Sequence, residues 1–184
     1  MKASPTPLPG VLVLEPKVFG DARGAFFESY RADLFKGLGI DCAFVQENQS
    51  RSTRGVLRGL HYQRVQPQAK LVRVVQGEIF DVAVDVRRGS PTFGQWAAER
   101  LSDENRKQMF VPVGFAHGFL VLSPTADVIY KTSDFYNPPG ERGILWSDPD
   151  LRIPWPLEGL VPTVNDRDSR YPRLSAAPRE DLFP

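Results

Sequence analysis

The stretch AKLVRVVQGEIFDVAVDVR, residues 69–87, carries the clearest strand pattern of the chain. Apolar side chains occupy every second position across residues 80–86, whereas Asp81 and Asp85 lie on the opposite parity. Successive side chains of a strand point to opposite faces of its sheet, so this alternation predicts a strand with one dry face. We expect the chain to turn at Gly77, just before the alternating run.

Similar short segments, rich in β-branched and aromatic residues, recur through the first three quarters of the chain and are separated by turn residues. Many short strands at this spacing predict an all-β sandwich or barrel. The other segments that we expect to form strands are residues 11–19, 24–30, 55–63, 93–101, 108–114, 118–122 and 127–136.

Helix signals are few. RADLFKGLG, residues 31–39, predicts two helical turns that end at Gly37 or Gly39. SDENRK, residues 102–107, predicts a single turn capped by Ser102.

The C-terminal quarter is rich in proline, with nine of the 17 prolines lying beyond residue 137. Proline lacks a backbone N–H and ends helices and strands, so we expect a loop-rich segment with at most short helical turns. This segment also contains large aromatic side chains, which lead us to expect that it packs on the barrel: Trp146, Trp155 and Tyr171.

Length and composition narrow the function classes. The chain has 184 residues, 41% hydrophobic and 24% charged, which is ordinary for a globular protein, and we expect one domain over residues 1–184. A formal net charge of +1 argues against a nucleic-acid partner or an acidic membrane surface. No run of apolar residues is long enough to span a bilayer, and the N-terminus lacks the apolar stretch of a signal peptide. Because Cys42 is the single cysteine, an intrachain disulfide is excluded. We therefore expect a cytoplasmic protein.

FVPVGFAHGF, residues 110–119, contains a P-x-G-x-x-H pattern that matches one half of the cupin motif. Cupins are small antiparallel jelly-roll barrels, and many of them are metal enzymes. The other half of the motif, H-x-H followed by a glutamate, is absent, because His61 is followed two residues later by Gln63. With two histidines in the chain, a metal site would need both His61 and His117 together with a carboxylate. We expect no bound metal.

GVLRGLHYQ, residues 55–63, reads as a strand that nevertheless contains Arg58 and His61. Buried ionisable side chains are usually paired or functional, although a hydrogen-bonded core histidine is the simpler interpretation of His61 alone. Residues 58 and 61 have opposite parity, so both side chains reach one cavity only if the strand twists or bulges, for which Gly59 is the natural place.

Six stretches in order resemble the dTDP-4-dehydrorhamnose 3,5-epimerases of nucleotide-sugar metabolism. The resemblance is strongest over residues 10–174 and implies an all-β, cupin-type antiparallel jelly-roll barrel. The six stretches are GDARGAFFESY, FVQENQSRSTRGVLRGLHYQ, AKLVRVVQGEIFDVAVDVRRGSPTFGQW, FVPVGFAHGFLVLS, YKTSDFYNPPGERGILWSDPDLRIPW and NDRDSRYPRL.

The resemblance implies an isomerase that inverts C3 and C5 of dTDP-4-dehydro-6-deoxy-D-glucose through enolates, on the route to dTDP-L-rhamnose for cell-surface polysaccharide. The ketone at C4 acidifies the neighbouring C–H bonds, so no cofactor is required. By the same resemblance His61 is the base, since an imidazole suits proton abstraction near neutral pH, and Asp168 orients it. Lys70 would stabilise the enolate. Tyr130 would be the acid that reprotonates the opposite face.

The resemblance also implies a set of residues that bind the nucleotide and the sugar. They are Arg23, Glu28, Gln46, Asn48, Arg58, His117, Glu141, Arg167 and Arg170. Family members are generally homodimers in which an N-terminal strand crosses to the partner, which would place Arg23 and Glu28 in the neighbour's site. The family commonly has a serine and a lysine just before the aspartate that pairs with the catalytic histidine. Here Asn165 and Arg167 stand at those positions, before Asp168.

Other functions stay open at this point. A mono-epimerase acting at C3 or C5 alone, from a secondary-metabolite deoxysugar pathway, would use the same base and acid. A non-catalytic sugar-binding cupin would keep the barrel and lose the catalytic set, so the joint presence of His61, Lys70, Tyr130 and Asp168 argues against it. A metal-dependent cupin enzyme would require a bound metal on active protein.

Overall fold

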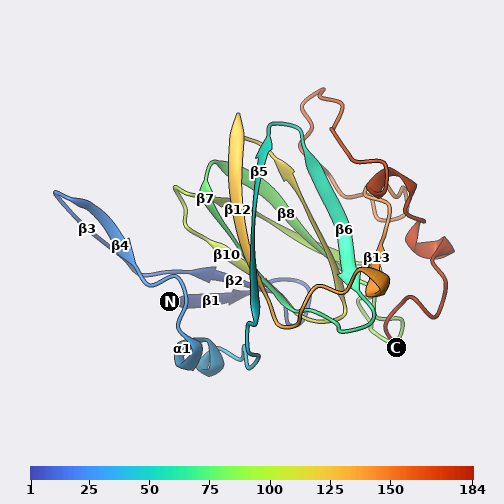
Figure 1. Cartoon of the computed structure of the whole chain (residues 1–184), viewed down its shortest axis with the longest axis horizontal. Coiled ribbons are helices and arrows are strands. Elements are labelled where there is room, and N and C mark those ends of the chain that lie inside the picture. Colours follow the sequence, from blue (N-terminus) through green and yellow to red (C-terminus); the bar gives the residue numbers. More distant parts are fainter.

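Two facing antiparallel sheets form the barrel of the computed structural model, which describes residues 1–184 (Figure 1). One sheet has six strands, in the order β1 (Lys2–Pro5), β2 (Leu12–Glu15), β10 (Gln108–Val111), β7 (Lys70–Gln76), β12 (Thr125–Thr132) and β5 (Gln46–Thr53). The other has five, in the order β13 (Glu141–Gly143), β6 (Leu57–Gln63), β11 (Phe115–Val121), β8 (Glu78–Asp85) and β9 (Trp96–Ser102). The all-β barrel predicted from the sequence is confirmed.

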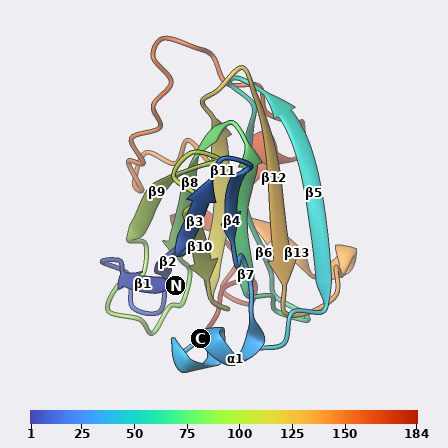
Figure 2. The same ribbon diagram turned by 90° about the vertical axis from the view of Figure 1, so that its left-hand side faces the viewer.

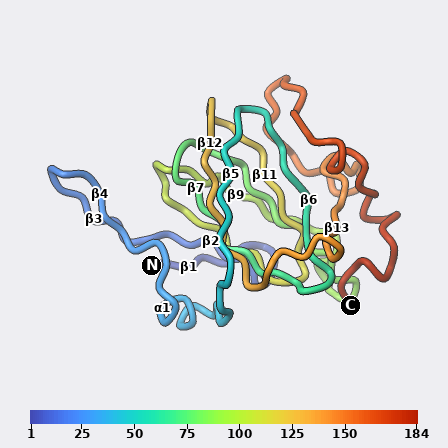
Figure 3. Tube along the Cα trace, in the orientation of Figure 1, coloured from blue at the N-terminus to red at the C-terminus, as the bar shows by residue number.

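A separate hairpin projects from one end of the molecule, and the C-terminal segment covers the other (Figures 1 and 3). The hairpin consists of β3 (Val18–Asp21) and β4 (Gly24–Phe27), which pair only with each other. The remaining elements are short helices: α1 (Ala32–Gly37), η1 (Pro138–Gly140), η2 (Asp168–Arg170) and η3 (Leu174–Ala176). The helix expected at residues 31–39 therefore forms and ends at Gly37.

The barrel interior is filled from both sheets by apolar side chains, among them Val72 of β7 and Val128 of β12. A second core lies outside the five-stranded sheet, where Leu151, Leu174 and Phe183 of the C-terminal segment pack on that sheet. The expectation that this proline-rich segment packs on the barrel is confirmed.

This second core corrects the expectation of a single dry face on β8. Val82 and Val84 contact the C-terminal segment, whereas Asp81 and Asp85 point the other way and are also fully buried, at 0% exposed. Asp85 is buried because it accepts hydrogen bonds from Arg87, Ser90 and Thr92. Both faces of the strand are therefore dry, and the charged positions are buried with partners.

Two turns behave as the sequence indicates. Gly77 joins β7 to β8 with a φ of +79°, and a Cβ there would lie 2.1 Å from the carbonyl oxygen of Thr125. Residues 102–107 form a single turn in which the Ser102 hydroxyl accepts the backbone N–H of Asn105 at 3.0 Å. Figure 2 shows the strands that these turns connect, viewed from the side of the projecting hairpin.

Strand β5 was not among the expected strands. Its sequence, QENQSRST, contains no apolar residue, and it forms an edge of the six-stranded sheet by pairing with β12 alone. Its inward side chains line a polar cavity rather than the apolar core, so a hydrophobic alternation is absent from it.

Candidate functional site

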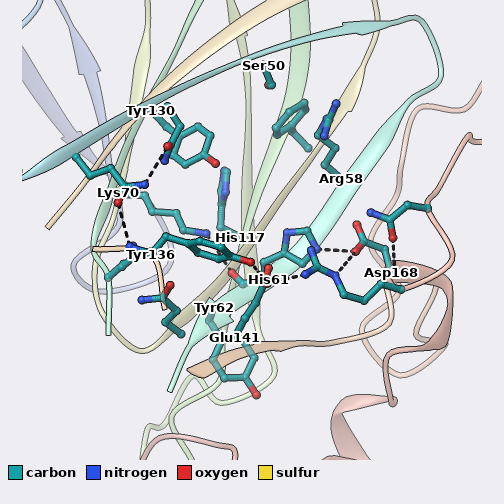
Figure 4. Close-up of a pocket in the computed structure, with 17 residues that line it drawn as sticks. Ser50, Arg58, His61, Tyr62, Lys70, His117, Tyr130, Tyr136, Glu141 and Asp168 are labelled. Atoms are coloured by element: carbon teal, nitrogen blue, oxygen red, sulfur yellow. Dashed lines mark hydrogen bonds and ion pairs between the residues drawn. The ribbon is translucent and has the colours of Figure 1, made fainter. Parts of the chain in front are cut away.

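A cavity of about 380 Å³ opens at the side of the barrel between the inner faces of the two sheets (Figure 4). Residues from β5, β6, β7, β11 and β12 line it together with the segments around residues 136–141 and 165–168. Of the 13 residues predicted for the site, ten line this cavity: His61, Lys70, Tyr130, Asp168, Gln46, Asn48, Arg58, His117, Glu141 and Arg167.

A bulge in β6 brings Arg58 and His61 to the same cavity. His61 lies opposite His117 on β11, and Arg58 lies opposite Phe119, so three residue steps on β6 match two on β11. Gly59 makes this irregularity sterically feasible: its φ is +132°, and a Cβ there would lie 2.5 Å from the Cα of Gly118. The sequence required a twist or a bulge, with Gly59 as the natural place, and the structure shows a bulge there.

His61 and Asp168 form a hydrogen-bonded pair at the cavity wall. The Nε2 atom of His61 is 2.8 Å from Oδ1 of Asp168, and the backbone N–H of Gly59 donates to the other carboxylate oxygen at 3.1 Å. Burial alone would raise the pKa of Asp168, but hydrogen bonds from His61 and Gly59 hold it below its ordinary value. An ionised carboxylate can only accept, so the neutral imidazole carries its proton on Nε2 and leaves Nδ1 as a proton acceptor.

Lys70 and Tyr130 bring two further titratable groups to the cavity. Burial lowers the pKa of Lys70 to about 8, against an opposing effect of the negative charges of Asp81 and Glu141. Its Nζ donates to the backbone carbonyl of His61 at 3.3 Å. Burial raises the pKa of Tyr130, so its phenol keeps its proton at neutral pH.

A second histidine pair lies beside the first. The Nε2 atom of His117 is 2.7 Å from Oδ1 of Asp81, and both residues are buried. Oδ2 of Asp81 has no hydrogen-bond partner. In the structure Asp81 holds His117, and its negative charge opposes the loss of the Lys70 proton.

Glu141 connects three segments at the rim of the cavity. Its Oε2 accepts from the Tyr136 hydroxyl at 2.7 Å and from Nη1 of Arg167 at 2.6 Å. Nε of Arg167 lies 3.7 Å from Oδ1 of Asp168, so the rim network reaches the dyad.

Three predicted binding residues lie outside the cavity. Arg23 in the β3–β4 hairpin pairs with Asp21 at 2.6 Å, and Glu28 pairs with Arg31 at 3.5 Å. Nε of Arg170 donates to the carbonyl of Asp166 at 2.8 Å.

Several cavity residues were not predicted. Gln63 and Gln68 bind backbone carbonyls of the loop at residues 134–135, and Asn165 accepts the backbone N–H of Asp168 at 2.7 Å. Polar residues of this kind also occur on any surface loop, so the sequence offered no distinguishing signal for them. The other unpredicted lining residues are Ser50, Tyr62, Phe119 and Tyr136.

No group of three or more histidine, cysteine, aspartate or glutamate side chains is arranged to hold a metal ion. No helix of the chain is both long enough and apolar enough to cross a membrane.

The chain is similar to known proteins in both sequence and fold. Residues 5–176 match the family model described as dTDP-4-dehydrorhamnose 3,5-epimerase. The chain belongs to the dTDP-4-dehydrorhamnose 3,5-epimerase family. It is 56% identical to the dTDP-4-dehydrorhamnose 3,5-epimerase of Pseudomonas aeruginosa, over 100% of both chains.

Solved structures agree with the sequence comparison. The dTDP-6-deoxy-D-glucose-3,5-epimerase of Legionella pneumophila Philadelphia 1, in complex with dTDP-4-keto-L-rhamnose, superimposes with a TM-score of 0.96 at 49% identity, covering 99% of this chain and 97% of that one. A 3'-monoepimerase from Streptomyces bikiniensis, in complex with dTDP-quinovose, gives a TM-score of 0.89 at 38% identity over 97% of this chain and 91% of that one. The predicted cupin-type jelly roll is confirmed.

Proposed function

We propose that the chain is an isomerase that epimerises C3 and C5 of dTDP-4-dehydro-6-deoxy-D-glucose and yields dTDP-4-dehydro-L-rhamnose for dTDP-L-rhamnose biosynthesis. The observation that carries the proposal is the meeting of the His61–Asp168 pair with Lys70 and Tyr130 in one cavity. The full-length identity to 3,5-epimerases supports the same conclusion.

His61 is the base in this proposal. Its Nδ1 atom, free because Nε2 is held by Asp168, takes the hydrogen from the carbon next to the C4 ketone. Asp168 keeps the imidazole in this tautomer and stabilises the imidazolium that forms. The C–H electrons move into the ketone, which becomes an enolate.

Lys70 and Tyr130 complete the reaction. The ammonium of Lys70, partly buried in the cavity wall, offsets the negative charge that develops on the enolate oxygen. Tyr130 keeps its proton at neutral pH and returns a proton to the carbon from the opposite face, which inverts the centre. Before the next round His61 releases its proton to solvent and Tyr130 regains one from solvent. Two such rounds, at C3 and C5, need no redox step.

Substrate binding is assigned to the polar remainder of the cavity. Arg58 lines the cavity and donates its Nε–H to the neutral Ser52 hydroxyl at 3.1 Å, and its positive charge suits a diphosphate. Gln46, Asn48 and His117 supply further polar contacts, and Glu141 and Arg167 form the rim.

Arg23, Glu28 and Arg170 remain predicted binding residues that lie outside the cavity of their own chain. We propose that the chain is a homodimer and that the β3–β4 hairpin brings Arg23 and Glu28 to the partner's cavity. The projection of the hairpin and the exposure of Phe19 and Phe26, at 53% and 72%, support this proposal.

Mixing two inactive variants tests the dimer. Arg23→Ala and His61→Ala chains, unfolded and refolded together, should regain activity, because a mixed dimer contains one site with neither change. Separately refolded variants mixed afterwards serve as the control. No recovery, or an active monomer by light scattering, would overturn strand exchange.

A cytoplasmic location stays a prediction, which fractionation of the source cells would test.

A coupled assay tests the reaction itself. Purified chain, dTDP-4-keto-6-deoxy-D-glucose, a 4-ketoreductase and its reduced nicotinamide cofactor should yield dTDP-L-rhamnose. A product inverted at one carbon only would identify a mono-epimerase, the activity of the Streptomyces bikiniensis relative. Binding without turnover would favour a sugar-binding protein.

A further inference from the structure

The aspartate of the dyad lies in a surface turn. Within residues 165–170 Asp168 is the single buried residue, and its neighbours are exposed. Exposed turns are the mobile parts of a fold, whereas a base and its carboxylate need a fixed geometry. Asn165 holds the N-terminal side of this turn through the backbone N–H of Asp168, at 2.7 Å.

Tyr171 holds the C-terminal side of the same turn. Its ring rests directly on Gly143: a Cβ at that glycine would lie 2.4–2.5 Å from three ring atoms. The carbonyl oxygen of the next residue, Pro172, accepts a hydrogen bond from the backbone N–H of Leu145 at 2.8 Å. This bond fixes the backbone next to the Tyr171 ring. The ring fits here because residue 143 has no side chain.

Gly143 is the direct neighbour of His61 across the β13–β6 pairing. The Tyr171 ring on this glycine therefore meets the imidazole, with ring centroids 5.7 Å apart and planes inclined at 68°. Edge-to-face contact of this kind is a favourable arrangement for aromatic rings. Tyr171 does not line the cavity itself, and its ring contacts the imidazole of His61, which does.

We propose that Tyr171, seated on Gly143, is a positioning residue that fixes the ring of His61 against Asp168. The inference rests on the proposed role of His61 as the base. The aromatic ring, rather than the hydroxyl, does the positioning, because the ring makes both contacts. The pKa of the phenol, raised to about 12 mainly by burial, keeps the group neutral at working pH.

Three single variants and one double variant test the contact. Tyr171→Phe keeps the ring and should retain kcat within about twofold, whereas Tyr171→Leu should lower kcat about 10- to 100-fold with little change in KM. Gly143→Ala should have the effect of Tyr171→Leu, because its methyl group displaces the ring. The double variant Gly143→Ala/Tyr171→Leu should be no worse than Tyr171→Leu alone, since the ring that the methyl group meets is gone.

Trp155 provides a matched control for general loss of packing. It makes a similar edge-to-face contact, 5.9 Å and 74°, with Phe80 on the outer face of the five-stranded sheet. Trp155→Leu should lower the melting temperature and leave kcat unchanged below that temperature. If Tyr171→Leu behaves like Trp155→Leu, Tyr171 is merely structural and the proposal is overturned.

Imidazole ¹⁵N NMR gives a readout that does not depend on turnover. The chain has two histidines, so the signals can be assigned with one histidine variant. In the unaltered protein and in Tyr171→Phe, His61 should show a single tautomer with the proton on Nε2. In Tyr171→Leu it should show an averaged pattern while His117 is unchanged. Identical spectra in all three proteins would overturn positioning, whereas absent turnover in the unaltered protein would overturn the proposed function alone.

Discussion

The Nε2 atom of His61 lies 2.8 Å from Oδ1 of Asp168, although the two residues are 107 positions apart in the sequence. The same carboxylate accepts the backbone N–H of Gly59, the residue at which β6 bulges. The bulge and His61, the proposed base, are therefore held by one buried side chain. A change that moves either of them disturbs both.

Removing either member of this pair should abolish most of the activity. His61→Ala should lower kcat at least ~100-fold, the lower range for loss of a positioned base. Asp168→Asn removes the negative charge that stabilises the imidazolium and should lower kcat by a similar factor or more. Steady-state kinetics measure both effects. If the double variant is far slower than each single variant, the two residues do not act as one unit.

The charge of Lys70 should set the alkaline limit of activity. The pKa of this lysine is about 8, below its ordinary value, so its cationic form is lost as the pH rises through that value. We expect kcat/KM to fall above about pH 8, by roughly tenfold per pH unit. Lys70→Arg should keep some activity and move this limb to higher pH, because a guanidinium stays charged. A profile that is flat to pH 10 in the unaltered protein would contradict the role.

Tyr130→Phe should separate proton removal from inversion. The base remains, so C3–H should still exchange with deuterated water, whereas inversion should fall ~100-fold because the opposite face lacks its proton donor. Comparing deuterium incorporation with product formation by NMR distinguishes the two steps. Equal losses of exchange and inversion would show that Tyr130 is not specifically the acid.

The bulge should depend on the absence of a side chain at Gly59. Gly59→Ala places a methyl group 2.5 Å from the Cα of Gly118 at a φ of +132°, and it should destabilise the fold by about 2 kcal/mol or more. Gly24→Ala is the matched control, since Gly24 has a φ of +127° with nothing within 4 Å of an added Cβ. Denaturant unfolding of both variants measures the difference. Equal destabilisation would show that the clash is relieved without cost.

Most strands of the barrel could be predicted because they contain either a run of β-branched residues or a clear alternation of apolar and polar residues. Strand β5 could not, since its inward residues, such as Gln46 and Asn48, serve the cavity rather than the core. The alternation of β8 was seen correctly, but Asp81 and Asp85 indicated a wet face that the barrel in fact buries with partners. Polarity of a side chain predicts its need for a partner more reliably than its exposure.

Site residues could be predicted from the sequence where they belong to a distinctive motif. His61 and Asp168 come from two such motifs, and the structure brings them into contact. Tyr136 and Asn165 were missed because their contribution depends on which distant atoms they meet, Glu141 and the backbone of Asp168 respectively. The sequence also could not show that Gly143 makes room for Tyr171.

The most direct test of the central claim is proton NMR of dTDP-4-keto-6-deoxy-D-glucose in deuterated water with the purified protein and a chelator. The signals of H3 and H5 should both disappear with the unaltered protein and persist with His61→Ala. Persistence of both signals with the unaltered protein would contradict epimerisation, and loss of one alone would restrict the reaction to that carbon.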